Sequence, residues 1–245
     1  MRQWSSATRG LLAAVVAAAF VVGFAPARAA DEPAHGSHYL APGFTTLEGD
    51  AKIVIMPVDV ELSSISAGGV HEPKADWTAA ASANMKAALD ARISQLGVNA
   101  VLMSDTEADE FGELVGLHAA VARSIALHHG MGGVWALPTK QGRLDWTFED
   151  SMKPIEEKTN ARYALFVWVR DSYASAERKV AMVGLALLGV GITGGSQVGY
   201  ASLVDLETGR VVWFNRLARA SGDLRDEPSA KESIRVLMRG FPAVR

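Results

Sequence analysis

The chain has 245 residues, a formal net charge of −3, 49% hydrophobic residues and no cysteine. A chain without cysteine forms no disulfide and cannot be lipidated on an N-terminal cysteine, so its core alone must hold the fold. A slightly acidic protein with scattered charges is not built to grip a phosphate backbone, so we expect no nucleic acid partner.

The start of the chain has the three parts of a secretory signal peptide. Arg2 and Arg9 form a positive end, residues 11–24 are a nearly unbroken apolar run, and residues 27–29 (Ala-Arg-Ala) match a cleavage site. The alternative is an uncleaved anchor, but the run is about 14 residues long and a bilayer needs about 20. We predict a signal peptide over residues 1–29, cleaved near Ala29, and a periplasmic mature protein. Because that segment carries three arginines and no acid, cleavage takes the net charge from −3 to −6.

Residues 30–74 predict one strand between two irregular segments. Residues 30–50 contain prolines and glycines without an apolar period, which indicates a flexible N-terminal arm. Residues 52–58 are a short apolar run, typical of a central strand covered on both faces. Residues 61–74 are rich in serine, glycine and proline and indicate a long loop. We expect residues 51–245 to form a single α/β domain.

Two helices and a strand are expected next. Apolar residues recur mostly at every fourth position over residues 76–96, with Asp76 as the N-cap and Gly97 as the left-handed residue after the helix. Residues 98–103 predict a short strand, and residues 111–129 predict a second helix.

The C-terminal half predicts a strand, a hairpin and a final helix. Residues 163–169 are bulky and apolar throughout, which again favours a central strand. The strands of residues 198–206 and 211–217 flank a turn that ends at Gly209. A capping-box spacing that begins at Ser229 predicts the last helix. A glycine-rich turn region and a short helix are expected earlier, over residues 130–142 and 151–159.

This order of elements predicts an α/β (α+β) fold: a mixed β-sheet with packed helices and an apolar, glycine-rich insert before a C-terminal β-hairpin. The insert, residues 180–195, is too short to span a membrane as a helix, since 16 residues rise about 24 Å against a hydrocarbon core of about 30 Å. Leaving its large apolar side chains in water would forgo roughly 12–24 kcal/mol.

Three interpretations of the insert stay open at this stage. It is a buried element of the domain, a subunit interface, or a segment that enters a membrane surface or a larger pore. Its five glycines favour a kinked or partly extended form. The candidate interaction residues are Val180, Met182, Val183, Leu185, Leu187, Leu188, Val190 and Ile192.

Two motifs near the insert do not match the context that their chemistry needs. Residues 189–194 fit G-x-G-x-x-G, but a dinucleotide site needs a helix after the glycines, and the following residues predict a strand. Ser196 lacks the second glycine of a nucleophile elbow.

We assign no catalytic, cofactor-binding or metal-binding residue and expect no cofactor. On one helix His118 and His129 would lie about 16 Å apart, too far to hold one metal ion, so surface or capping roles are expected for them. The acids of residues 105–113 are interpreted as the solvated start of a helix. This cluster and the acids of residues 145–150 are the candidates for a hydrolase, and Trp135 and Trp146 are the candidates for a ligand site.

Three short pieces carry a family resemblance. They are the hairpin of residues 199–213 with its Asp-x-x-Thr-Gly turn and final Trp213, the opening strand of residues 53–58 with Pro57, and residues 160–167. Together they resemble envelope lipoproteins related to the curli secretion channel protein and to penicillin-binding-protein activators with a TolB N-terminal-like fold.

The resemblance implies a non-enzymatic envelope role in assembly, scaffolding or ring formation at the outer membrane. Two departures limit it: the chain has no cysteine to carry a lipid anchor, and residues 180–195 do not alternate as a pore-lining hairpin would. We therefore expect a periplasmic protein, associated with the outer membrane or free, that supports an envelope complex. Its expected partners are an envelope protein or a second copy, with peripheral membrane contact. A periplasmic hydrolase or a small-ligand-binding protein is the alternative.

Overall fold

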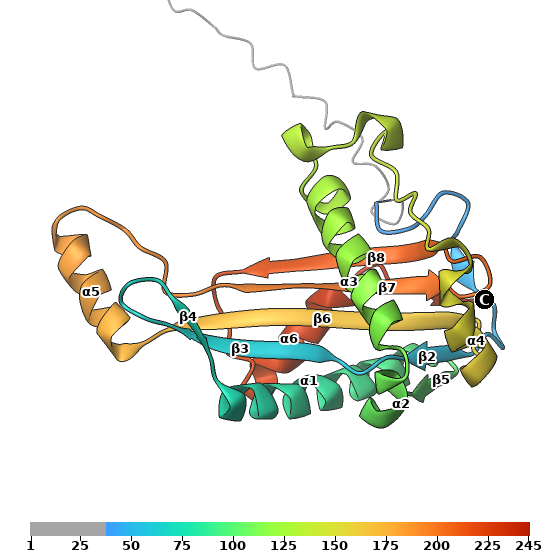
Figure 1. The fold of residues 1–245 in the computed structure, drawn as a ribbon, viewed down its shortest axis with the longest axis horizontal. Coiled ribbons are helices and arrows are strands. Elements are labelled where there is room, and N and C mark those ends of the chain that lie inside the picture. Colours follow the sequence, from blue (N-terminus) through green and yellow to red (C-terminus); the bar gives the residue numbers. More distant parts are fainter. Residues whose placement is uncertain (1–37) are drawn as a thin grey trace, which may run out of the picture. The chain divides into compact units, whose positions relative to one another are not determined.

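The computed structural model describes residues 38–245, so the expected signal peptide and residues 30–37 lie outside the described residues. The described chain belongs to one compact unit, Pro33–Arg245. It contains a seven-stranded mixed sheet with helices on both faces, which confirms the expected α/β class (Figure 1).

The long strand β6 (Tyr163–Ala174) organises the sheet. β2 (Ile53–Ile55) and β3 (Asp59–Ile65) pair with it in parallel, one after the other along the same edge. β7 (Gln197–Asp205) pairs antiparallel with the other edge, and β8 (Val211–Arg219) continues the sheet beyond β7. β4 (His71–Pro73) and β5 (Ala100–Leu102) complete it beside β3 and β2.

The two faces of β6 are buried against different helices. Leu165 and Val167 belong to a core that α1 (Ala75–Leu96) and α6 (Glu227–Leu237) complete. Phe166 belongs to a second core on the opposite face, which α3 (Gly112–Ile125) and α4 (Lys153–Thr159) cover. The uninterrupted apolar run of this strand follows from burial on both sides, as the sequence predicts.

Residues 38–50 pack against the domain, whereas the sequence predicted a flexible arm there. The backbone N–H of Ala41 donates to the carbonyl of Val212 at 2.9 Å, and both Ala41 and Leu47 are buried. β1 (Thr46–Leu47) pairs in parallel with β9 (Ala243–Val244) near the C-terminus. This part of the chain is therefore held against the domain.

The prediction of a long loop is wrong for the segment of residues 61–74. It contains most of β3 and all of β4, joined by a tight turn. Ser63 and Ser64 are buried because β3 pairs along β6, and the Ser63 hydroxyl bonds with the Nδ1 atom of His71 at 3.0 Å. Serine content misled the prediction because small polar side chains are acceptable in a strand whose hydroxyls find partners.

The expected caps are partly wrong. α1 begins at Ala75, so Asp76 lies in the first turn, while Gly97 takes the expected left-handed conformation with φ of 65°. α6 begins at Glu227, two residues before the expected cap Ser229, and Pro228 occupies its first turn. The capping box of the structure is at Ser104, which starts the short helix α2 (Asp105–Asp109).

The helix expected over residues 111–129 ends earlier, at Ile125. A π-helical turn, Ala126–Met131, replaces its last turn. The hairpin of β7 and β8 is confirmed, and Gly209 closes it with φ of 65° where an added Cβ would lie 2.0 Å from the carbonyl oxygen of Glu149. Short 3-10 turns connect the remaining elements at Gly133–Trp135, Pro138–Lys140 and Glu149–Met152.

Candidate interaction site

The insert between β6 and β7 forms a projecting finger, defined here as residues 175–196. It contains α5 (Ala176–Leu187) followed by an irregular return segment. Figure 1 shows α5 beyond the ends of β6 and β7, away from the helices that cover the sheet. The helix ends at Leu187 and the return is extended, which matches the expectation of a partly extended form.

The apolar side chains of the finger are exposed. None of the eight candidate interaction residues is buried, so the interpretation of the insert as a buried element of the domain is wrong. Met182, Leu185 and Ile192 are half-buried. The exposed fractions of the others are 73% for Val180, 65% for Val183, 84% for Leu187, 78% for Leu188 and 47% for Val190.

Beyond its first turn, which carries the exposed Glu177 and Lys179, the finger is apolar on every side. Residues 180–192 contain no charged, hydroxyl or amide side chain. The return segment is joined to the helix by Arg178, which donates to the carbonyl of Thr193, and a Cβ added at Gly194 would lie 3.3 Å from Met182 Cε. A helix that is apolar all round needs an apolar environment on all its faces.

The neck of the finger is held by Ser175 and Arg178. The Ser175 hydroxyl caps α5 by accepting from the backbone N–H of Arg178 at 3.2 Å. The Arg178 guanidinium donates to the carbonyl of Thr193 at 3.0 Å and to that of Ser66 at 3.3 Å. One side chain therefore joins both sides of the finger to the turn between β3 and β4.

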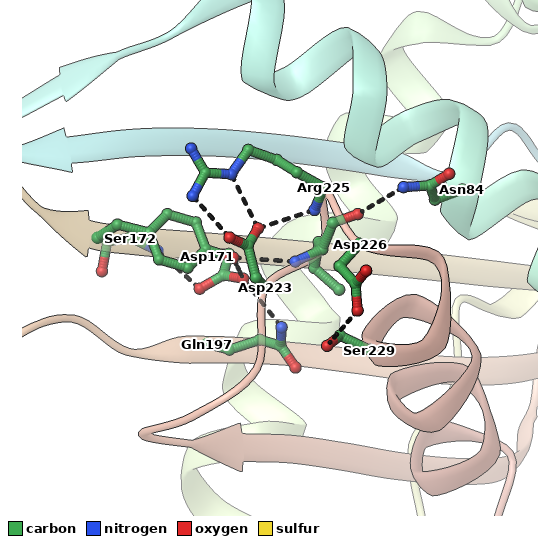
Figure 2. Close-up of polar contacts among 10 residues, drawn as sticks. Asn84, Asp171, Ser172, Gln197, Asp223, Arg225, Asp226 and Ser229 are labelled. Atoms are coloured by element: carbon green, nitrogen blue, oxygen red, sulfur yellow. Dashed lines mark hydrogen bonds and ion pairs between the residues drawn. The ribbon is translucent and has the colours of Figure 1, made fainter.

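A buried polar network lies where β6 ends and β7 begins, next to the neck in sequence (Figure 2). Asp171 and Gln197 are 3% and 0% exposed. The carboxylate of Asp171 accepts from the Ser172 N–H at 2.8 Å, from Gln197 Nε2 at 2.9 Å and from the Tyr173 hydroxyl. The Ser233 hydroxyl of α6 donates to Gln197 Oε1 at 2.8 Å, which connects the network to the helix below the sheet.

A second part of the network surrounds Arg225. Its guanidinium makes a two-pronged ion pair with Asp223, with distances of 2.8 and 2.6 Å, and lies over the rings of Trp77 and Tyr173. Figure 2 shows Asn84 of α1 reaching the same segment through the carbonyl of Leu224, at 3.1 Å. Four elements thus meet below the finger and fix its base.

The pKa shifts in this polar network are those expected of buried groups whose hydrogen bonds are all made. Burial raises the pKa of Asp171, although its hydrogen bonds to Tyr173 and Gln197 oppose the shift. Burial and the neighbouring Asp171 raise the pKa of Tyr173. Hydrogen bonds from Arg225 lower the pKa of Asp223. A buried carboxylate with three donors is typical of a structural anchor.

Two of the five acids of residues 105–113 have a partner within the fold. Glu107 is locked in the capping box, where its hydrogen bonds to Ser104 lower its pKa. Glu110 pairs with Lys158 at 3.0 Å. The interpretation of this cluster as a helix start is confirmed, and the helix is α2.

The second acidic cluster and the two tryptophans do not come together as a site. Asp150 pairs with Lys153 at 2.8 Å. Trp146 lines a cavity of only about 10 Å³, and Trp135 is not among the residues that line it. The Nδ1 atom of His128 donates to the carbonyl of Trp135 at 2.7 Å. These residues therefore provide no room for a bound molecule.

The histidines correct one expectation. His129 stacks on His38 and its Nε2 donates to the His38 carbonyl at 2.9 Å, as suits a surface role. His118 is instead buried on the inner face of α3, with its Nε2 2.6 Å from the Ser202 hydroxyl and its ring stacked on Phe166. Burial lowers the pKa of His118 to about 3.

Two further tests concern metals and membranes. Within residues 38–245, no group of three or more His, Cys, Asp or Glu side chains has the geometry to hold a metal ion. No helix in that same range is both long and apolar enough to cross a membrane. The segment after the glycines of residues 189–194 is β7, so the dinucleotide motif lacks its helix.

The sequence alone missed the polar network. Asp171 and Gln197 stand 26 positions apart and Ser233 lies 36 beyond Gln197. The one local signal was the polar pair at 171 and 172 that follows an apolar strand. Nothing in that pair indicates which distant residues complete it.

No protein-family model and no curated protein matches the chain. Among solved structures it is similar to the PelC dodecamer from Paraburkholderia phytofirmans, with 15% identity, a TM-score of 0.40 and coverage of 84% of this chain and 95% of that chain. It is also similar to lipoprotein GNA1162 from Neisseria meningitidis (13% identity, TM-score 0.29, 70% of this chain and 81% of that one). The LpoB C-terminal domain from Salmonella enterica gives 12% identity and a TM-score of 0.26 over 73% of this chain and 87% of that one. Likenesses this weak support no transfer of function.

Proposed function

We propose that the protein is a non-enzymatic component of the bacterial periplasm that attaches to a membrane surface through its finger and supports the assembly or scaffolding of an envelope complex there. The observation that carries the proposal is the exposure of the apolar finger above a fixed polar base. The signal-peptide pattern of residues 1–29 supports the extracytoplasmic location.

The chemistry of the finger favours lipid over a protein groove. Protein interfaces carry about one hydrogen bond per 100–200 Å² and are enriched in aromatic residues and arginine. Residues 180–192 contain no aromatic residue and no arginine, and the one interface-enriched side chain among them is that of Met182. A protein groove would also cover one face of a helix, whereas residues 180–192 are apolar on all faces.

The free energy that the exposed apolar side chains would gain in a membrane suits reversible attachment. Burying a large apolar side chain gains about 1.5–3 kcal/mol, and the five exposed side chains together amount to about three and a half complete burials, or about 5–10 kcal/mol. A myristoyl chain, with an association constant of about 10⁴ M⁻¹, lies at the low end of that range. One finger alone therefore gives peripheral and reversible attachment, and several fingers in one assembly would bind far more tightly.

Two of the three charges at the neck fit the same orientation, and the third, the exposed Glu177, opposes it. Lys179 is exposed at the start of α5, directly before the apolar residues. Arg178 lies beside it, at the level where lipid headgroups would be if the tip entered the acyl layer. Basic side chains close to an anionic membrane surface contribute about 1 kcal/mol each.

The test is flotation of the chain from Ala30 to Arg245 with vesicles of phosphatidylethanolamine and phosphatidylglycerol. We expect the wild-type chain to float with the vesicles and the double variant Leu187→Ser/Leu188→Ser to bind at least about tenfold more weakly, since it loses two of the most exposed apolar side chains. The matched control is Val101→Ser/Leu102→Ser, which removes two side chains that are each 45% exposed on β5.

The outcomes separate lipid from a second copy of the chain. Loss of flotation only in the finger variant supports the proposal. Equal flotation of all three proteins, or none with the wild type, would overturn it. If the wild type does not float and is an oligomer by light scattering without vesicles, while the finger variant is a monomer, the finger is a subunit interface and the lipid attachment is wrong.

A further inference from the structure

A cavity of about 280 Å³ lies on the α3 face of the sheet, far in sequence from the finger. It opens where the edge of β6 changes partner. Ile55 pairs with Leu165 and Asp59 pairs with Trp168, so three residues, 56–58, face only two, 166 and 167. This extra residue and Pro57, which has no N–H to donate, interrupt the edge beside α2.

The inner wall of the cavity is apolar and aromatic. Met56 and Phe166 are buried at its floor. Trp168 and Tyr200 stack on each other with ring centroids 5.1 Å apart, and both line the space, while the Arg170 guanidinium lies over the Trp168 ring at 4.7 Å. His118 also lines it, and because burial holds its pKa at about 3 the ring is neutral and adds no positive charge.

All the charges that line the cavity are negative. They are the carboxylates of Asp59, Asp105 and Asp109, and no lysine or arginine is among the lining residues. Asp59 is neutralised by Arg170 at 2.7 Å. Asp105 and Asp109 stand four positions apart on α2, and neither has a basic partner within ion-pair distance among residues 38–245.

We infer that this cavity binds a small organic cation with an apolar body, such as an amine or a quaternary ammonium compound. The apolar floor and the aromatic wall take the hydrocarbon part, and the two aspartates at the mouth balance the charge. A volume of this size admits a small molecule and not a polymer. The inference does not depend on the membrane attachment of the finger.

The experiment titrates the chain from Ala30 to Arg245 with three probes by calorimetry: benzyltrimethylammonium, benzyl alcohol and phenylacetate. Because the aspartates at the mouth favour a positive charge, we expect the cation to bind at least about fivefold more tightly than the neutral alcohol and the anion to bind most weakly. Trp168→Phe should remove the change in tryptophan fluorescence that accompanies binding, because only this tryptophan lines the cavity.

Two charge variants test the cause of the preference. Asp105→Asn/Asp109→Asn should bring the cation within about twofold of the neutral probe. Glu113→Gln/Glu157→Gln removes the same charge from residues that do not line the cavity and should leave the preference intact. Ala108→Leu, which fills the space beside α2, should weaken all three probes.

The proposal is overturned if none of the probes binds at millimolar concentration to the folded wild type, or if the cation and the neutral alcohol bind equally. It is also overturned if both charge variants lower the preference to the same extent, since the effect would then be the net charge of the protein. Circular dichroism of each variant confirms that it is folded before it is titrated.

Discussion

Two apolar runs in this chain differ in burial: one lies in the core and the other is exposed to solvent. Residues 163–169 of β6 are almost entirely buried, and Leu165 and Val169 are 0% exposed. In the finger, Leu187 and Leu188 are 84% and 78% exposed. Both runs lack charged residues, so apolar content does not decide which of them enters the core.

The difference lies in the partners that each run finds. β6 has strands on both edges and helices on both faces, so each of its side chains is covered by some element. The finger begins where Gln197 and Asp171 end the pairing of β6 with β7, and it extends past the helices. An apolar run that leaves its sheet must find its cover outside the domain, and the predictions below test that conclusion from the largest effect to the smallest.

The largest effect is expected in β6. Leu165→Ala should lower the free energy of unfolding by about 2–5 kcal/mol, because it removes buried methyl groups and leaves a cavity between the sheet and its helices. Urea denaturation at pH 7 measures it. A loss below about 1 kcal/mol would show that this strand is not the centre of the core.

His118 should make stability fall in acid. Its folded-state pKa of about 3 lies below the ordinary value of 6.5, so its contribution is present above pH 6.5 and is lost as the pH falls toward 3. Relative to His118→Gln, wild-type stability should fall by about 1.4 kcal/mol per pH unit in that window. Parallel curves for the two proteins between pH 7 and pH 4 would contradict the burial of this ring.

Replacing one carboxylate oxygen in the polar network below the finger should lower the stability of the fold. Asp171→Asn places an amide donor where two donors already point, which should cost about 1–3 kcal/mol. Because burial raises the pKa of Asp171, its contribution is greatest in acid and diminishes as the pH rises through that pKa. The cost of the substitution should therefore be larger at pH 4 than at pH 7, and a cost that grows with pH would be the wrong sign.

The smallest effect on stability is expected in the finger itself. Leu187→Ala should change the free energy of unfolding by less than about 0.5 kcal/mol, because its side chain is exposed in the isolated chain. The same denaturation experiment, run beside Leu165→Ala, gives the contrast directly. A loss near that of Leu165→Ala would mean that the finger is part of the core.

Local patterns predicted well what local contacts determine. The central strand of residues 163–169, the left-handed Gly97 and the hairpin turn at Gly209 depend on neighbours in sequence and were predicted correctly. β3 was missed because its buried serines are explained only by pairing with residues more than 100 positions away. Caps were misplaced by a few residues because Ser104 and Ser229 both fit the motif locally.

The candidate site was predicted in part. The sequence identified the apolar segment but favoured burial within the domain, because hydropathy carries no information about the covering element. The polar network and the cavity escaped it, since each joins residues from several elements. His118 belongs to the same class: only the packing of α3 on Phe166 shows that it is buried.

The most direct test of membrane attachment uses the absence of cysteine in the chain. A single cysteine at Leu188 carries a polarity-sensitive fluorophore, and the control carries the same label at Ala87, which is exposed on α1. With vesicles that contain nitroxide-labelled lipids, the label at residue 188 should shift its emission to the blue and be quenched, while the label at residue 87 should be unchanged. Identical, unquenched emission at both positions would contradict attachment through the finger.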